Sequence, residues 1–256
     1  MNKRTEHVPS FDGTPLAVHR VGEGRPVLML HGLFSSARMN WMRFGHARAL
    51  ADAGFEAIMP DLRAHGDSGA PHDVEAYPSN VLVRDAVALV ARLGLEDFDL
   101  VGFSLGARTA VGAVSEGLSP GRLVLAGMGL ESLSNWDERA AFFVDAIDRF
   151  EEVRQGDPAF FTVQFMKTMR IDRVAARLLL TRGIGDPPAD VLGDLTMPTL
   201  VVAGDKDQDN GSPRALYEAL PNASFEEVQG THMSSVTEPA LGQAIARFLQ
   251  REPAAP

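Results

Sequence analysis

The chain has 256 residues, no cysteine and a formal net charge of −10 at pH 7, with 45% hydrophobic and 23% charged residues. This balance is ordinary for a globular enzyme and excludes a disordered chain, while the acidic charge argues against nucleic acid or an anionic membrane as partner. The lack of cysteine excludes disulfides, thiolate metal sites and cysteine nucleophiles.

The N-terminal residues carry basic side chains with no apolar region behind them, so they do not resemble a signal peptide. No run approaches the ~18–20 apolar residues that cross a bilayer. We therefore expect a cytoplasmic protein. The length suits one larger α/β domain, or one such domain with an inserted lid.

The first half of the chain alternates strand and helix patterns. Asp12-Gly13 is a turn dipeptide between two short alternating segments, which predicts a hairpin within residues 5–21. Continuous apolar runs predict strands that are buried on both faces. The predicted strands are 26–30, 55–59, 98–103 and 122–126; the predicted helices are 37–53, 79–93 (capped by Ser79) and 105–116.

Residues 130–195 break this alternation, because they contain helical stretches such as 136–152 and 158–169 and no strand pattern. We predict that they form a helical cap inserted over the carboxyl edge of the sheet. Its phenylalanines either pack the cap itself or line an apolar acyl or alcohol pocket. They are Phe142, Phe143, Phe150, Phe160, Phe161 and Phe165, with Met166 and Met169 among them.

Strand patterns at 199–203 and 224–228 and helix patterns at 213–220 and 239–250 follow the predicted cap. The fold class predicted is α/β, a mostly parallel, doubly wound, eight-stranded sheet with helices on both faces. Residues 1–129 and 196–256 would form its core, and 253–256 would be a frayed tail.

The pentapeptide 102–106, Gly-Phe-Ser-Leu-Gly, lies between a predicted strand and a predicted helix. Gly-x-Ser-x-Gly at such a turn is typical of a nucleophile elbow, in which the serine adopts a strained backbone conformation. Side chains at Gly102 and Gly106 would clash with the neighbouring strand and helix. Ser104 is therefore the candidate nucleophile.

The strand at 26–30 runs into His31-Gly32, where a loop can supply a backbone donor opposite the nucleophile. The amide of Leu33 is the candidate, paired with the amide of Leu105, and His31 is expected to be structural. Later in the chain, Asp207 follows the strand at 199–203 and His232 follows the strand at 224–228. Asp207 can orient an imidazole, and His232 can accept the proton of Ser104.

Two other acids, Asp205 and Glu131, lie near these strands. Asp205 is expected to be a solvated loop charge. Glu131, after the strand at 122–126, is a rival for the acid, but the Gly-x-x-Asp spacing after a strand favours Asp207.

Taken together, these pieces resemble the α/β-hydrolase fold superfamily, in particular its esterase-like serine hydrolases with a short helical cap. The matching segments are Leu30-His31-Gly32, residues 61–68, 102–106 and 204–207, and Gly230-Thr231-His232. The chain departs from the family's usual pattern at Ala64, where glycine is common, and at Thr231, which separates Gly230 from His232. The resemblance implies Ser104 as nucleophile, His232 as base, Asp207 as acid and the Leu33 and Leu105 amides as oxyanion hole. Haloalkane dehalogenases and epoxide hydrolases of this fold use an aspartate nucleophile, so Ser104 argues against both.

The function predicted is hydrolysis of an ester, lactone or thioester of a small apolar substrate through an acyl-enzyme. One alternative is carbon–carbon bond hydrolysis of a diketone ring-fission product, with Arg38, Arg108 or Arg170 as possible partners of a substrate carboxylate, although these are expected to be surface charges. Another is a receptor on the same fold. We expect no cofactor and no metal: His65, Asp61 and Asp67 lie in the loop that is structural in the family. Oligomeric state is not predicted.

Overall fold

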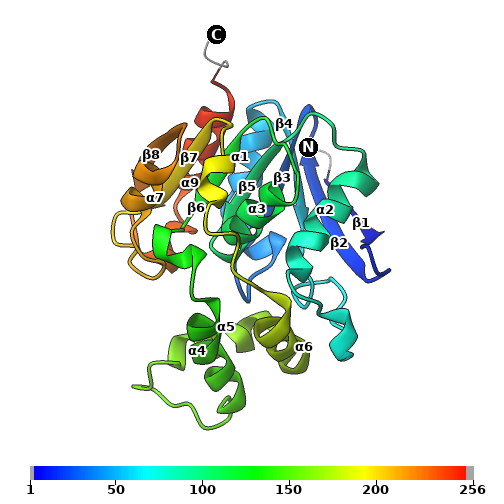
Figure 1. Cartoon of the computed structure of the whole chain (residues 1–256), viewed down its shortest axis with the longest axis vertical. Coiled ribbons are helices and arrows are strands. Elements are labelled where there is room, and N and C mark those ends of the chain that lie inside the picture. Colours follow the sequence, from blue (N-terminus) through cyan, green and yellow to red (C-terminus); the bar gives the residue numbers. More distant parts are fainter. Residues whose placement is uncertain (1–2, 252–256) are drawn as a thin grey trace.

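The structure, a computed structural model, describes residues 3–251. Its centre is an eight-stranded sheet with the strand order β1-β2-β4-β3-β5-β6-β7-β8 (Figure 1). The strands are β1 (Lys3–Pro9), β2 (Pro15–Gly22), β3 (Arg25–Leu30), β4 (Phe55–Pro60), β5 (Asp99–Phe103), β6 (Leu123–Ala126), β7 (Thr199–Gly204) and β8 (Ala223–Val228). β1 pairs with β2, and β2 with β4, in antiparallel fashion, and every other pair of neighbours is parallel. The predicted fold class is confirmed; the predicted tail, 253–256, lies outside the described residues.

Helices cover both faces of the sheet. They are α1 (His46–Asp52), α2 (Val81–Leu93), α3 (Leu105–Ser115), α4 (Trp136–Asp148), α5 (Phe160–Met169), α6 (Arg173–Leu178), α7 (Pro213–Ala219), α8 (His232–Ser235) and α9 (Pro239–Leu249). Along β3, Leu28 and Leu30 join the core that includes α2 and α3, while Val27 and Met29 join the core that includes α1 and α9. This alternation explains why the strand is apolar throughout, since both of its faces are buried.

Two of the predicted helices begin or run differently. The helix expected over 37–53 is a short π-helical turn, Arg38–Met42, followed by α1, because Gly45 before α1 adopts the left-handed conformation with φ 85°. The helix expected to start at Ser79 instead follows Asn80, whose φ is 56°. The Asn80 side chain does not cap that helix, because its oxygen accepts a hydrogen bond from the amide of Gly185.

No strand lies between β6 and β7, so the described residues 130–195 are helical or irregular. Besides α4, α5 and α6 they contain short helical turns at Leu130–Leu133, Leu179–Gly183 and Val191–Asp194. Figure 1 shows α4, α5 and α6 together in a lobe outside the sheet. We call residues 130–195 the helical lobe; its standing as a separate cap with these boundaries remains a prediction.

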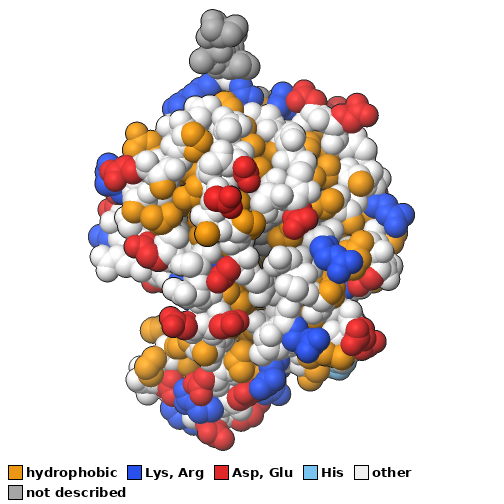
Figure 2. Space-filling model, viewed as in Figure 1, with side chains coloured by type: hydrophobic (Ala, Val, Ile, Leu, Met, Phe, Trp, Pro, Cys, Tyr) orange, Lys and Arg blue, Asp and Glu red, His pale blue; other side chains and the backbone are white. Residues whose placement is uncertain are grey.

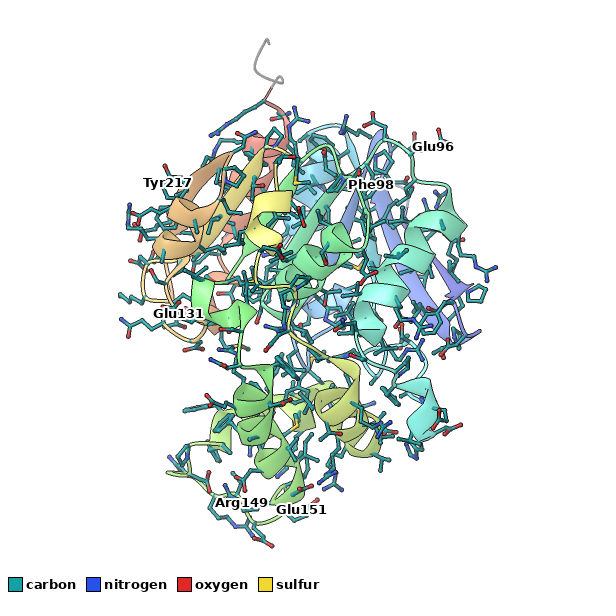
Figure 3. The ribbon with its side chains drawn as sticks, in the orientation of Figure 1. Glu96, Phe98, Glu131, Arg149, Glu151 and Tyr217 are labelled. Atoms are coloured by element: carbon teal, nitrogen blue, oxygen red, sulfur yellow. The ribbon has the colours of Figure 1, made fainter. Side chains whose placement is uncertain are left out.

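The surface visible in Figure 2 carries acidic and basic side chains interspersed among neutral ones. At the far end of the lobe, Arg149 pairs with Asp145 and Asp157 at 2.6 and 2.8 Å (Figure 3). Within residues 3–251, no helix combines the length and the apolar character needed to cross a membrane.

Candidate active site

Ser104 occupies the sharp turn between β5 and α3, with φ 54° and ψ −116°. A non-glycine residue in this region costs on the order of 1–3 kcal/mol. The flanking glycines permit the turn: a Cβ on Gly102 would lie 2.4 Å from the Ala107 nitrogen, and one on Gly106 would lie 2.1 Å from the Leu30 oxygen. Close approach of backbone to backbone therefore requires glycine at both positions.

The structure brings Ser104, His232 and Asp207 into one line of hydrogen bonds. His232 Nε2 lies 3.1 Å from Ser104 Oγ, and His232 Nδ1 lies 2.9 Å from Asp207 Oδ2. The Asp207 side chain is 2% exposed and that of His232 is 12% exposed. Because a carboxylate only accepts, Nδ1 carries the ring proton and Nε2 is left to accept from the serine hydroxyl.

Two loops meet to make this alignment. A Cβ on Gly204, at the end of β7, would lie 2.2 Å from the Gly230 oxygen, so only glycine allows the loops to touch. Asp205 accepts a hydrogen bond of 2.8 Å from the Gly230 amide, and the Lys206 amide donates to the Gly230 oxygen at 3.0 Å. Asp205 is exposed, as expected for a solvated loop charge, and its carboxylate also joins the loop after β7 (the acid loop) to the loop after β8 (the histidine loop).

The inserted Thr231 has a local role. Its side chain accepts from the Ser234 amide, and the Ser234 side chain accepts from the Thr231 amide, which forms a capping box at the start of α8. His232 is the first residue of that helix. Thr231, which separates Gly230 from His232, therefore caps the helical turn that begins at His232.

The loop after β3 leaves the Leu33 amide without a partner in the described part of the chain. The Gly32 amide donates to Asn40 Oδ1 at 3.1 Å, that of Phe34 to His65 Nε2 at 2.9 Å, and that of Ser35 to the Gly32 oxygen. Among the described residues, the amides of Leu33 and Leu105 have no hydrogen-bond acceptor. A Cβ on Gly32 would lie 3.5 Å from Ser104 Cβ, so this loop runs beside the serine.

Buried histidines shape that loop. His31 Nε2 accepts from the Leu62 amide at 2.9 Å while its Nδ1 donates to the Gly32 oxygen. His65 Nδ1 donates to the Arg63 oxygen at 2.9 Å. Burial lowers the pKa of both rings, that of His65 to about 3, so each is neutral with a fixed tautomer. The structural role predicted for His31 agrees with these contacts.

Stability should therefore fall in mild acid. Burial lowers the pKa of His31, His46 and His65 below the unfolded value near 6.5, so the unfolded chain binds more protons below that pH. Their contribution is present above about pH 6.5 and declines as pH falls toward the folded values. We expect urea midpoints to be lower at pH 5 than at pH 7.

The matched variant His65→Gln, which keeps an acceptor for the Phe34 amide, should reduce that pH dependence. His19 has the opposite sign, because its hydrogen bond to Asp61 raises its pKa. The difference between wild type and His65→Gln is therefore the test, and an unchanged slope in the variant would contradict it.

Glu131, the rival acid, lies at the junction of the sheet and the helical lobe (Figure 3). Its carboxylate accepts from the Ser212 amide at 2.7 Å, which lowers its pKa, and it makes no hydrogen bond to His232. A Cβ on Gly211 would lie 2.0 Å from Glu131 Oε2. Glu131 thus contacts the loop that carries Asp207, at Gly211 and Ser212, and is not hydrogen-bonded to His232.

Two groups of side chains have metal-ligand spacing among the described residues: His19, Asp61 and Asp67, and Asp207, Asp209 and His232. In the first, Asp61 accepts from the amides of Ala37 and Asp67 and lies 3.2 Å from His19. The second group contains Asp207 and His232, which are hydrogen-bonded to each other as described above. His65, considered for a metal from the sequence, belongs to neither group.

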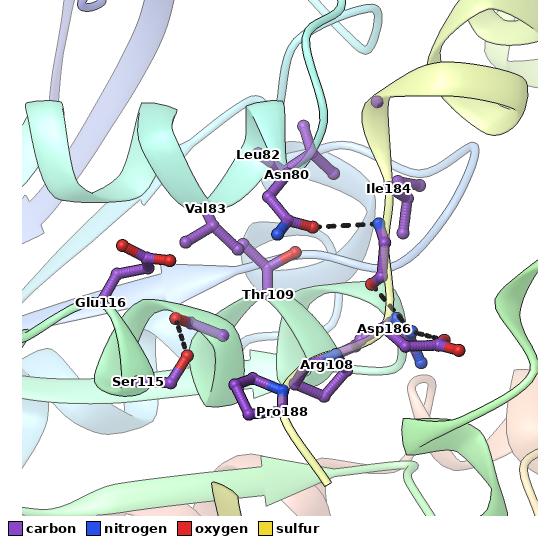
Figure 4. A pocket seen from close by; sticks show the side chains of 14 residues that line it. Asn80, Leu82, Val83, Arg108, Thr109, Ser115, Glu116, Ile184, Asp186 and Pro188 are labelled. Atoms are coloured by element: carbon purple, nitrogen blue, oxygen red, sulfur yellow. Dashed lines mark hydrogen bonds and ion pairs between the residues drawn. The ribbon is translucent and has the colours of Figure 1, made fainter.

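A cavity of about 290 Å³ lies away from Ser104, between α2, α3 and the return segment 183–188 (Figure 4). Arg108 on α3 lines it and is buried, so the expectation of a surface charge is wrong. Its guanidinium donates to the carbonyls of Ser132 and Gly185 and pairs with Asp186. Asp186 also accepts from the Trp136 amide at 3.0 Å. Arg108 therefore links the segment where the chain enters the helical lobe, at Ser132, to the segment where it leaves, at Gly185 and Asp186.

Sequence reasoning missed two linked side chains near the triad. Asn210, from the loop after β7, lies close to His232, and Arg139, from α4, donates to Asn210. No local motif marks either residue, since their contacts join positions far apart in the chain.

Residues 25–176, more than half of the chain, match the family described as the alpha/beta hydrolase fold. "Epoxide hydrolase 2" of Siraitia grosvenorii is 36% identical over 109 residues, which cover 42% of this chain and 34% of that protein. The chain thus spans about a third of the length of the epoxide hydrolases it matches. "Non-heme chloroperoxidase CPO-A1" of Kitasatospora aureofaciens is 27% identical over 86% of this chain and 89% of its own length. A solved esterase (EaEST) from Exiguobacterium antarcticum superimposes with a TM-score of 0.78 at 20% identity, covering 97% of this chain and all of that one.

The sheet order, the serine elbow and this match agree. The chain belongs to the alpha/beta hydrolase fold family, whose solved relatives of this shape include esterases, an enol-lactonase and a bromoperoxidase.

Proposed function

We propose that this protein is a serine hydrolase that cleaves carboxylic esters, lactones or thioesters of small apolar substrates. The observation that carries the proposal is the unbroken line from Asp207 through His232 to Ser104, at 2.9 and 3.1 Å. The unpartnered amides of Leu33 and Leu105 supply what the line lacks, a pair of donors for the oxyanion. Each part has one chemical task, and together they fit acyl transfer.

In the proposed reaction, Ser104 Oγ bonds to the substrate carbonyl carbon while His232 Nε2 takes the hydroxyl proton. The Leu33 and Leu105 amides bind the resulting oxyanion, and Asp207 stabilises the imidazolium. His232 then gives the proton to the departing alcohol or thiol as its bond to carbon breaks. Water, deprotonated by His232, attacks the acyl-enzyme and restores Ser104.

The substrate class rests on the aromatic side chains beside the site. Phe143 of α4 contacts Phe34 edge to face, with ring centroids 5.7 Å apart. Phe34 lies in the loop after β3 that carries Leu33, which we call the oxyanion loop. Phe143 is half-buried, whereas Phe34 is 2% exposed and Met166, which packs within the lobe, is 1% exposed. Because Phe34 follows Leu33 directly in the chain, this aromatic pair lies next to a candidate oxyanion donor, which favours an apolar acyl or alcohol group.

Serine at position 104 argues against epoxide hydrolysis by this chain, despite the relatives of that name. An aspartate that opens an epoxide forms an ester, whose carbonyl water can attack. A serine that opened one would form an ether, which has no carbonyl and would leave the enzyme alkylated. The chemistry of Ser104 therefore suits substrates that bring their own carbonyl.

The carbon–carbon hydrolase alternative needs a cation free to bind a substrate carboxylate. Arg108 is engaged by Asp186 and two carbonyls, and Arg38 and Arg170 are exposed. Arg108 is therefore not free for this role; Arg139, which donates to Asn210 near His232, is the cation that would have to take it.

The test is turnover of p-nitrophenyl esters from acetate to octanoate, run beside a vinylogous diketone, together with labelling by a fluorophosphonate. We expect ester turnover, an optimum at short chains, and a mass increase on the peptide that contains Ser104. Turnover of the diketone alone would overturn the ester assignment. Neither turnover nor labelling would contradict the proposal and favour a receptor.

A further inference from the structure

Asn210 reaches His232 from the loop between β7 and α7. Its side-chain nitrogen lies 3.1 Å from His232 Nδ1 and 3.4 Å from Nε2. An atom at these distances in the plane of the ring would overlap Cε1, so the amide nitrogen lies over the ring face. An N–H group over an aromatic face makes a weak attractive contact. This contact can fix the tilt of the ring while Nδ1 faces Asp207 and Nε2 faces Ser104.

Two partners set the orientation of the buried Asn210 amide. Its nitrogen donates to the Gly127 oxygen at 3.0 Å, and its oxygen accepts from Arg139 Nη2. A flip of the amide would turn a donor toward the guanidinium and an acceptor toward the carbonyl, so both bonds would be lost. The amide is therefore held with its nitrogen toward His232.

Arg139 makes this contact from the helical lobe. It is half-buried, and among the described residues its guanidinium forms no ion pair with a carboxylate. Its Nη1 also lies 3.5 Å from the backbone carbonyl oxygen of Asp209. Phe143 lies four residues further along α4, hence on the same face of the helix. That face contacts both sides of the site, through Asn210 at His232 and through Phe34 at the oxyanion loop.

We propose that Arg139 and Asn210 are positioning residues, which hold the His232 ring in line with Ser104 when α4 is seated over the site. The inference rests on the proposed serine-hydrolase function and adds the contact by which the helical lobe takes part in it. The lobe then does more than enclose the substrate, because its docking sets the rate of proton transfer at His232.

The first measurement is kcat and KM for a p-nitrophenyl ester in Arg139→Met, Asn210→Ala and the double variant. We expect kcat to fall about 10- to 100-fold, as for a misplaced catalytic group, with a smaller change in KM. The double variant should be no slower than the slower single one, since both act through one contact. Arg139→Lys should recover part of the rate, because its amine can still donate to Asn210.

The matched control is Arg182→Met, which removes an exposed arginine from the same lobe and should leave kcat unchanged. Thermal unfolding of every variant identifies loss of folding. If Asn210→Ala does not fold, the inference is tested by kcat of Arg139→Met against kcat of Arg139→Lys, which should be higher.

A second readout separates positioning from packing. Among the described residues, Asp207 and Asp209 are the acidic groups near His232, and Arg139 reaches it only through Asn210. Asn210→Asp would add a carboxylate over the ring, which stabilises the protonated imidazole, so the acid limb of kcat/KM should move to higher pH. An unmoved limb, or wild-type kcat in both Arg139→Met and Asn210→Ala, would overturn the inference while Ser104→Ala still abolishes turnover. Turnover that survives Ser104→Ala would instead remove the proposed function, and this inference with it.

Discussion

Replacement of Ser104 with alanine is expected to lower kcat for ester hydrolysis by about 10⁶-fold, the loss typical when a triad nucleophile is removed. The reason is that the bond to the substrate carbonyl forms at Oγ, and no other hydroxyl is hydrogen-bonded to His232 Nε2 among the described residues. The measurement is p-nitrophenyl acetate turnover against a buffer blank, with fluorophosphonate titration to exclude traces of wild type.

His232→Ala should cost about as much as Ser104→Ala, and the double variant little more, because the two side chains act as a unit. Residual catalysis of about 10³- to 10⁴-fold over water is expected to persist, since the Leu33 and Leu105 amides remain. Ser104→Ala activity within a hundredfold of wild type would contradict the mechanism.

A matched variant separates chemistry from fold. Ser104→Gly also lacks the hydroxyl, but glycine adopts φ 54° and ψ −116° without a clashing Cβ. It should be as inactive as Ser104→Ala and unfold at a higher temperature. Equal melting temperatures for the two variants would argue that the elbow stores no strain.

The parts of the site that sequence reasoning anticipated are those with a local signal. The strand, turn and helix around Ser104 lie within consecutive residues, and Gly102 and Gly106 mark where backbone meets backbone. Likewise Asp207 and His232 each follow a recognisable apolar strand. Their mutual approach depends on Gly204 and Gly230, whose closeness no local pattern reveals.

The parts that sequence reasoning missed depend on contacts between distant positions. Arg139 and Asn210 are 71 residues apart, and His65 and Phe34 are 31 apart. Arg108 was expected on the surface because arginine is rarely buried, yet the helical lobe covers α3 and supplies Asp186 as its partner. Whether a polar side chain is buried depends on which segment packs over it. For Arg108 that segment is far away in the chain, so its packing could not be predicted from local sequence.

Asp207→Asn is expected to lower kcat by about 10⁴-fold, because an amide at Nδ1 no longer fixes the ring tautomer or stabilises the imidazolium. Glu131→Gln should leave kcat within a few-fold of wild type, since its neutral oxygen can still accept from the Ser212 amide. The two variants change a carboxylate to an amide of equal size, so they are matched controls for each other. Both would be assayed for kcat on one p-nitrophenyl ester at pH 7 and for thermal unfolding. Near-normal turnover in Asp207→Asn with collapse in Glu131→Gln would reassign the acid to Glu131, which would then have to leave Ser212 and approach His232. Collapse in both, with normal folding, would mean that Glu131 holds the acid loop in place for Asp207.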